Sequence, residues 1–170
     1  YSIVTSSNND EFGVYSNSNI ALHGNNYLST LGIGSAAWFG AARFSFNSNT
    51  ITETDPNNIF FNGFFNSDYL GSAFVIKVFE DENGNGSYDS GIDEAYALKV
   101  NLNTDSQWHK HSLTFNDLII DQSGNNILVD GILKPQNIIR IDITNSQSGS
   151  ANGQFGYFAD YFLVTYNEPL

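Results

Sequence analysis

The chain has 170 residues, of which 41% are hydrophobic and 15% aromatic, and it carries a formal net charge of −12. Such a composition excludes an intrinsically disordered segment, and the length predicts a single domain, residues 1–170, that buries its own core. The acidic balance argues against nucleic acids and anionic membranes as partners, because both would be repelled.

The sequence encodes no membrane span and no disulfide framework. No run approaches the roughly 18 apolar residues of a transmembrane helix, so we do not expect this domain to insert into a membrane. The chain contains no cysteine and no methionine, and it begins with Tyr1. We interpret it as a module excised from a larger exported protein, with neighbouring domains of the parent chain as partners. Abundant Asn, Ser, Thr and Gly favour an extracellular or outer-surface location on a bacterium.

Short apolar segments separated by Asn, Gly, Ser and Asp clusters predict β-strands rather than helices. We expect strands at residues 12–15, 27–33, 41–47, 59–65, 73–79, 95–100, 108–115, 138–143 and 155–166. In the third of these, Phe44 and Phe46 share one face, opposite Arg43. Segment 59–65 is apolar on both faces, which indicates a central strand. About eight or nine short strands and no helix predict an all-β fold, an antiparallel β-sandwich of jelly-roll type.

Segment 81–89, D-E-N-G-N-G-S-Y-D, has the spacing of a calcium-binding loop. Side-chain oxygens recur at alternate positions, and Gly86 stands at the sixth, where such a loop turns sharply. The twelfth position is Ile92 rather than a glutamate, but two carboxylates follow it and could complete the coordination. Strands rather than helices flank the segment, so we predict a structural calcium in a loop inserted into a β-hairpin. The expected ligands are Asp81, Asn83, Asn85, Ser87 through its carbonyl oxygen, Asp89, Asp93 and Glu94.

The alternative for this segment is a solvated acidic hairpin tip without an ion. Six acids and no Lys or Arg fall between residues 80 and 94. Without a cation these charges would repel one another. The ordered spacing and the glycine favour calcium.

Several segments share a pattern that extends over residues 12–166. They are residues 34–46 (G-S-A-A-W-F-G-A-A-R-F-S-F), 74–81 (F-V-I-K-V-F-E-D), 108–118 (W-H-K-H-S-L-T-F-N-D-L), 137–141 (N-I-I-R-I) and 156–164 (G-Y-F-A-D-Y-F-L-V). In this order they resemble the galactose-binding-like β-jelly-roll carbohydrate-binding modules of bacterial exported or surface polysaccharide-utilisation proteins. The chain departs from that pattern in lacking a proline at 113–115 and in adding the acidic hairpin.

The resemblance implies a non-catalytic module that recognises a polysaccharide or oligosaccharide, with a neutral β-glucan as one candidate. It also implies a second structural calcium between Asp10 or Glu11 and Asp160. The alternative for Asp160 is a hydrogen-bonding role near the end of the sheet, without a metal.

Flat aromatic rings that stack on sugar C–H faces are the expected binding groups. Trp38 is the first candidate, because small residues surround it and leave its ring uncovered; a core tryptophan is the alternative. Tyr27 and His23 lie in a comparable loop. Trp108 shares a strand face with Lys110, which places it on a sheet surface, although in the resembling modules this tryptophan often packs structurally and we favour the core for it.

Most of the few cations of the chain fall inside predicted strands. Five of the six Lys and Arg residues do so, namely Arg43, Lys77, Lys99, Lys110 and Arg140. Alternation with apolar neighbours should turn most of them away from the core. If several share the concave sheet, Arg140 would line a groove with Asp142 that could hydrogen-bond a glycan. An ordinary solvated sheet face is the alternative.

The sequence lacks the patterns of a sandwich-fold polysaccharide hydrolase or lyase. Sandwich hydrolases commonly carry paired carboxylates on one strand face as E-x-D-x-x-E, which is absent, as is the G-x-S-x-G nucleophile elbow. We therefore expect no catalysis. The main alternative to a binding module is a calcium-stabilised structural or adhesion module of a bacterial surface protein that binds no glycan. The aromatic surplus and the resemblance favour glycan binding.

Overall fold

The computed structural model describes residues 2–5, 11–33, 40–123, 126–147 and 154–170. Within them the chain forms eleven strands and three short 3₁₀ turns at 56–58, 115–117 and 135–137. The strands are β1 (Ser2–Thr5), β2 (Glu11–Ser16), β3 (Asn26–Ile33), β4 (Gly40–Ser45), β5 (Ile59–Asn66), β6 (Ser72–Glu80), β7 (Ala95–Asn101), β8 (His109–Thr114), β9 (Ile119–Ile120), β10 (Ile138–Gln147) and β11 (Gln154–Tyr166). No helix in the described ranges is long and apolar enough to cross a membrane.

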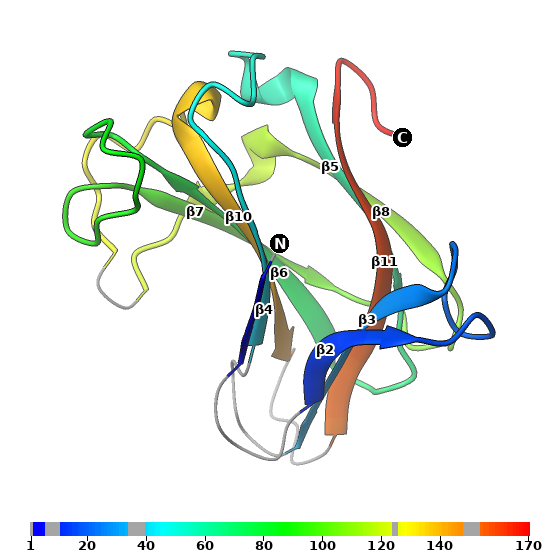
Figure 1. Cartoon of the computed structure of the whole chain (residues 1–170). Helices are drawn as coiled ribbons and strands as arrows, with labels where there is room; N and C mark the ends of the chain where they lie inside the picture. The colour runs from blue at the N-terminus through cyan, green and yellow to red at the C-terminus, as the bar shows by residue number, and fades with distance from the viewer. Residues whose placement is uncertain (1, 6–10, 34–39, 124–125, 148–153) are drawn as a thin grey trace.

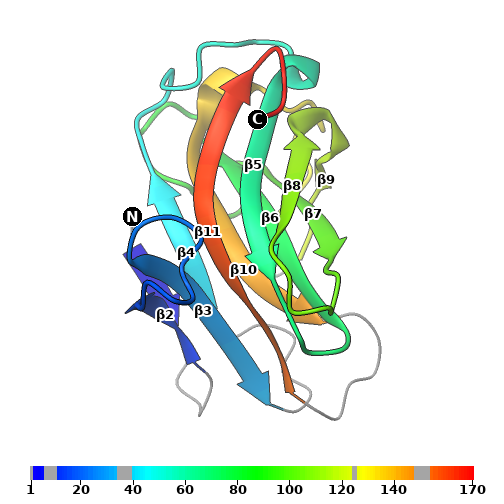
Figure 2. The ribbon, with the colours of Figure 1, turned by 90° about the vertical axis from the view of Figure 1, so that its right-hand side faces the viewer.

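The strands form two antiparallel sheets that pack face to face (Figures 1 and 2). The six-stranded sheet has the order β1-β4-β10-β6-β7-β9, and the five-stranded sheet has the order β2-β3-β11-β5-β8. Neighbours within a sheet are mostly distant in sequence, as in a jelly roll. The predicted all-β, antiparallel sandwich is confirmed.

The predicted strands match the observed ones closely, with two omissions. β1 and β9 have four and two residues and lie at the two edges of the six-stranded sheet. Strands this short carry too few residues to show an alternating pattern. The apolar segment 59–65 is central, as expected, because β5 pairs with β11 on one side and β8 on the other.

Aromatic rings from both sheets meet in the core. The rings of Phe65 on β5 and Phe74 on β6 stack with centroids 3.9 Å apart and planes 5° from parallel. Both side chains are fully enclosed, with 1% and 0% of their surface exposed. Tyr157 of β11 approaches Phe65 edge-on, with centroids 5.5 Å apart. These contacts hold the two sheets at a fixed spacing.

β11 changes its neighbours half-way along its length. It pairs with β3 as far as Ala159, and its pairing with β5 slips between Asp160 and Leu163. Tyr161, inside the slip, has a φ of 57°, a left-handed conformation that is uncommon outside glycine. Within this irregularity the Tyr161 side chain is exposed, whereas Phe162 stacks on Phe61 against the core.

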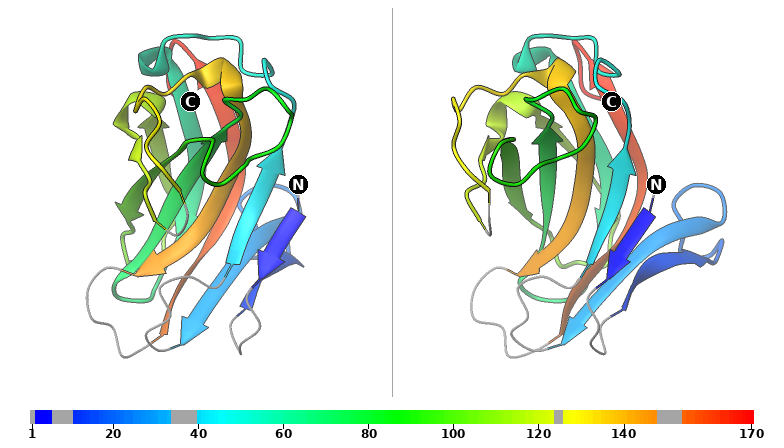
Figure 3. Two further views of the ribbon diagram at one scale, coloured as in Figure 1. Left: turned by 90° about the vertical axis from the view of Figure 1, so that its left-hand side faces the viewer. Right: turned by 60° about the vertical axis from the view of Figure 1, so that its left-hand side comes forward.

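Two connections lie on the outer side of the six-stranded sheet, the side away from the core. Segments 81–94 and 126–134 lie beside each other there (Figure 3). The Tyr88 hydroxyl in the first donates a hydrogen bond to Oδ1 of Asn126 in the second. The Tyr88 ring packs edge-on against Phe79 of β6, with centroids 4.9 Å apart. The hairpin tip therefore folds back over its own sheet.

Candidate functional site

The hairpin loop turns its carboxylates inward. Asp81 accepts hydrogen bonds from the backbone N–H groups of Asn85 (3.0 Å) and Gly86 (2.7 Å). Asp93 accepts from the N–H groups of Glu82 (2.9 Å) and Asp89 (2.6 Å). Asp81 and Asp93 are both buried. Gly86 has a φ of 83°, so the sharp turn predicted at this position is present.

The remaining predicted loop ligands gather around Asp89. The side-chain amides of Asn83 and Asn85 both donate to Oδ2 of Asp89, at 2.9 and 2.5 Å. The Ser87 N–H donates to Oδ1 of Asn85 at 2.8 Å. Five of the predicted side chains thus line one loop, and every group they offer to a cation is an oxygen, which suits calcium.

Glu94 does not join that loop. Its Oε1 accepts hydrogen bonds from the backbone N–H groups of residues 129–131. The Tyr96 hydroxyl donates to its Oε2 at 2.9 Å. The side chain therefore faces segment 126–134 rather than Asp89.

A buried group of three acidic side chains could hold a metal ion. One oxygen from each of Glu80, Glu82 and Glu94 lies within 4.8 Å of the others. Burial raises the pKa of the Glu80 carboxyl to about 8, although the backbone N–H of Lys134 acts to lower it. Of the three, the sequence pointed to Glu94 alone. Strand alternation could have found Glu80, because it follows Ile76 and Val78 on the inward face of β6.

Asp160 accepts hydrogen bonds from a backbone N–H shortly before the start of β3 and from one in its own strand, β11. Its Oδ2 accepts from the His23 N–H at 2.9 Å, and its Oδ1 accepts from the Tyr161 N–H at 2.7 Å. Asp10 and the side chain of Glu11 lie outside the described part of the chain. The second calcium at Asp160 stays a prediction.

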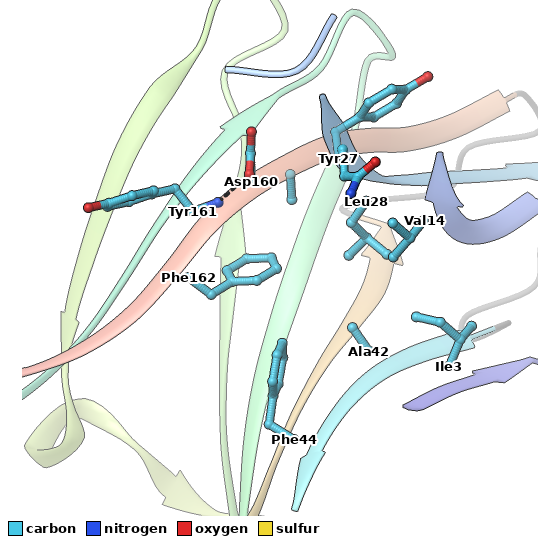
Figure 4. A pocket seen from close by; sticks show the side chains of 11 residues that line it. Ile3, Val14, Tyr27, Leu28, Ala42, Phe44, Asp160, Tyr161 and Phe162 are labelled. Carbon is cyan, nitrogen blue, oxygen red and sulfur yellow. Dashed lines mark hydrogen bonds between the residues drawn. The ribbon is translucent and has the colours of Figure 1, made fainter. Parts of the chain in front are cut away.

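An apolar cavity of about 250 Å³ opens beside Asp160, between the edges of the two sheets. Phe44 and Phe162 point into it, whereas the rings of Tyr27 and Tyr161 point away (Figure 4). Tyr27 packs edge-on against Phe158 with centroids 5.4 Å apart. The wall is mostly apolar, and Asn26, Asp160 and the two tyrosines are its polar members.

The structure brings Tyr27 and His23 to one end of the five-stranded sheet. The His23 ring approaches Tyr161 edge-on, with centroids 5.5 Å apart. Trp38 lies outside the described residues, so its position relative to Tyr27 is a prediction. Trp108 is half-buried and directly precedes β8.

Four cations project from the outer face of the six-stranded sheet, which we call the cationic face. They are Arg43 on β4, Lys77 on β6, Lys99 on β7 and Arg140 on β10. Each alternates with residues that pack into the core, so each points away from it. Lys110 lies on β8 of the other sheet. Four of the six Lys and Arg residues of this acidic chain thus share one face.

Arg43, Asp142 and Arg140 form the centre of the cationic face. Arg43 donates from Nε and Nη2 to the two carboxylate oxygens of Asp142, each at 3.0 Å. Nε of Arg140 lies 3.3 Å from Oδ1 of the same carboxylate. Asp142 itself is buried beneath the two guanidinium groups. One carboxylate therefore lies between two guanidinium groups and orients that of Arg43 through two hydrogen bonds.

Aromatic rings pack around Arg140. Its guanidinium carbon lies 3.3 Å from the Phe79 ring centroid and 5.5 Å from that of Tyr88. Lys77, one strand away, pairs with Asp121 at 2.7 Å. Neither Phe79 nor Tyr88 was predicted as a site residue, although Phe79 lies two residues after Lys77 on β6 and so shares its face. Hydrogen-bonding groups and aromatic surface thus occur together on this face.

Solved structures of carbohydrate-binding modules share this architecture. The family 11 module of the cellulosomal cellulase Lic26A-Cel5E of Clostridium thermocellum aligns with 98% of this chain and 87% of its own, with a TM-score of 0.65 at 13% identity. The family 30 module of the cellulosomal cellulase Cel9D-Cel44B of the same organism aligns with 98% and 91%, with a TM-score of 0.64 at 12% identity. The chain has the β-sandwich fold of these modules.

Two further solved structures are similar to the chain. A family 11 module from Clostridium thermocellum in complex with a β-1,3-1,4-mixed-linked tetrasaccharide aligns with 98% of this chain and 88% of its own, with a TM-score of 0.63 at 13% identity. A structure described as an exo-β-agarase aligns over 23% of its length and 98% of this chain, with a TM-score of 0.56 at 9% identity. No protein-family model and no curated protein matches the sequence.

Proposed function

We propose that the chain is a non-catalytic carbohydrate-binding module that recognises a polysaccharide or oligosaccharide outside the cell. The observation that carries the proposal is the Arg43–Asp142–Arg140 group beside Tyr88, on an outer sheet face of a sandwich shared with carbohydrate-binding modules. A neutral β-glucan is the first candidate ligand, because one of those modules was solved with a mixed-linked β-glucan tetrasaccharide.

The cationic face supplies the two kinds of contact that sugar recognition needs. The guanidinium groups of Arg43 and Arg140 donate hydrogen bonds to ring and hydroxyl oxygens, and the Tyr88 ring offers an apolar surface to sugar C–H groups. Asp142 fixes Arg43 through two hydrogen bonds and Phe79 packs against Arg140 before the ligand arrives, which lowers the entropy lost on binding. The loops that carry Tyr88 and Asn126 form the wall of the site at one end of the sheet.

The sequence predicts a second contact region at the loop edge, with Trp38, Tyr27 and His23. The exposed His23 packs edge-on against Tyr161, and Tyr161 lines the same cavity as the half-buried Tyr27, which supports this region. Trp108 would contribute from the segment before β8. A long polysaccharide can contact more than one surface of a small module, so the two regions are compatible.

Calcium has a structural role in this proposal. The hairpin loop would hold one ion through Asp81, Asn83, Asn85, Asp89, Asp93 and the carbonyl oxygen of Ser87, and a second ion would lie at Asp160. The inward carboxylates and the glycine turn of the loop support the first site. An extracellular or outer-surface location on a bacterium, where calcium is plentiful, fits the cellulosomal origin of the similar modules.

Affinity electrophoresis against soluble neutral and anionic polysaccharides, with calcium and with chelator, tests the proposal. We expect one class of glycan, β-glucans first, to retard the protein in calcium. Loss of that retardation in chelator would show that calcium supports binding, directly or through the fold. No retardation across a broad panel would contradict the proposal and favour a structural or adhesion module.

A further inference from the structure

The strongest unassigned feature is the group of buried acids behind the hairpin loop. Glu80 ends β6, Glu94 immediately precedes β7, and Glu82 lies between them in sequence. One oxygen of each lies within 4.8 Å of the others. Glu80 and Glu94 have 0% of their surface exposed, and Glu82 closes the group on its solvent side.

Two of the three carboxylates accept hydrogen bonds on both of their oxygens. Glu94 is held by the N–H groups of residues 129–131 and by the Tyr96 hydroxyl. Both oxygens of Glu82 accept from Nζ of Lys134, at 3.0 and 2.8 Å.

Glu80 differs from these two, because only one of its carboxylate oxygens accepts a hydrogen bond from the described residues. Its Oε1 accepts the backbone N–H of Lys134. Its Oε2 is buried and has no hydrogen-bond partner among the described residues. A buried carboxylate oxygen without a partner is unfavourable, and native structures that contain one usually place an ion or water there.

The charges in the group do not balance. Three carboxylates meet one ammonium group, that of Lys134, which Asp130 shares at 2.7 Å. A hard divalent cation would remove the excess negative charge and give Glu80 Oε2 a ligand. Calcium accepts such an all-oxygen, partly rigid set, whereas magnesium demands near-ideal octahedral geometry and retains water.

We propose that Glu80, Glu82 and Glu94 bind a calcium ion at a site separate from the one predicted around Asp81 and Asp89. The ion would join the ends of β6 and β7 to segment 129–134, which already contacts all three acids. Glu94 belongs to this site rather than to the loop around Asp89. The inference is independent of glycan recognition, so either can fail without the other.

Calorimetric titration of the chelator-treated protein with CaCl₂ tests the site, together with melting curves in calcium and in chelator. Glu80→Gln keeps the shape of the side chain and removes its charge, so it should bind one calcium ion fewer than the wild type and stay folded in chelator. Asp89→Asn should lose the loop ion and keep this one. Glu168→Gln, at an exposed position near the C-terminus, is the matched control and should titrate like the wild type.

Glu82→Gln gives a second measurement at a less buried position. We expect calcium affinity at this site to fall by at least about tenfold, because affinity follows the number of charged ligands. Titration with MgCl₂ should give much weaker binding. The proposal is overturned if Glu80→Gln and Glu82→Gln bind as many calcium ions as the wild type with unchanged affinity. It is equally overturned if the wild type binds none and Glu80 simply carries a proton.

Discussion

Arg43 and Asp142 are 99 residues apart in sequence, yet they form a two-pronged ion pair with both hydrogen bonds at 3.0 Å. They face each other across the β4–β10 pair, where Asp142 is the direct register partner of Arg43. The planar guanidinium matches the carboxylate, so the pair is fixed in orientation as well as in charge. Arg140, two residues before Asp142, completes the centre of the cationic face.

Replacing Arg140 by Gln should weaken glycan binding about ten- to hundredfold, the range of a central binding residue. The change removes a donor from the middle of the cationic face and its contact with Tyr88. Lys110→Gln, a cation on the other sheet, is the control and should bind as the wild type does. Calorimetry with the glycan identified by electrophoresis measures both, and equal affinities would place the site elsewhere.

Replacing Trp38 by Ala should abolish glycan binding and leave the fold intact, because stacking on this ring is the predicted loop-edge contact. The measurement is affinity electrophoresis, with circular dichroism as the check on folding. Retained affinity would assign recognition to the cationic face alone. A large decrease in the melting temperature of Trp38→Ala would instead show that Trp38 is a core residue.

Replacing Phe74 by Ala should destabilise the protein by about 3–5 kcal/mol, because a buried aromatic ring is lost and a cavity remains. The stack with Phe65 couples the two sheets, so its removal should destabilise the whole sandwich. Leu70→Ala, at a position 84% exposed, should change the free energy of unfolding by less than about 0.5 kcal/mol. Urea unfolding at neutral pH compares the two.

His111 should make stability depend on pH. Its ring packs edge-on against Phe65 and Phe74, with centroids 5.6 Å from each, and burial lowers its pKa, with a further contribution from the charge of His109. The folded state therefore prefers the neutral ring. This contribution to stability is present above the unfolded pKa of about 6.5 and is lost as the pH falls through the lower folded value.

The variant His111→Phe isolates that contribution. Between pH 7.5 and pH 5 it should lose less free energy of unfolding than the wild type, because it has no buried imidazole to protonate. His23→Gln, which removes an exposed histidine, should follow the wild type. Identical pH profiles for His111→Phe and the wild type would show that folding leaves the pKa of His111 unchanged.

The sequence by itself determined the class of fold and most of its strands. Alternation of Phe44 with Arg43, or of Val78 with Lys77, is local information, because side chains on a strand alternate between two faces whatever the strand pairs with. The same alternation predicted that the cationic side chains of the strands point away from the core. The spacing of 81–89 likewise predicted a tight loop, and Gly86 adopts the turn that this spacing requires.

Only the tertiary structure decided which strands are neighbours and therefore which residues meet. Four cations share one face because β4, β10, β6 and β7 are adjacent in a single sheet, while β8, with Lys110, joins the other. Among the residues that the structure describes, one oxygen of Glu80 has no hydrogen-bond partner, because segment 129–134 donates a single N–H to this side chain. Strand pairing depends on contacts between residues far apart in the chain, and the pattern within any one segment is the same whichever neighbour it acquires.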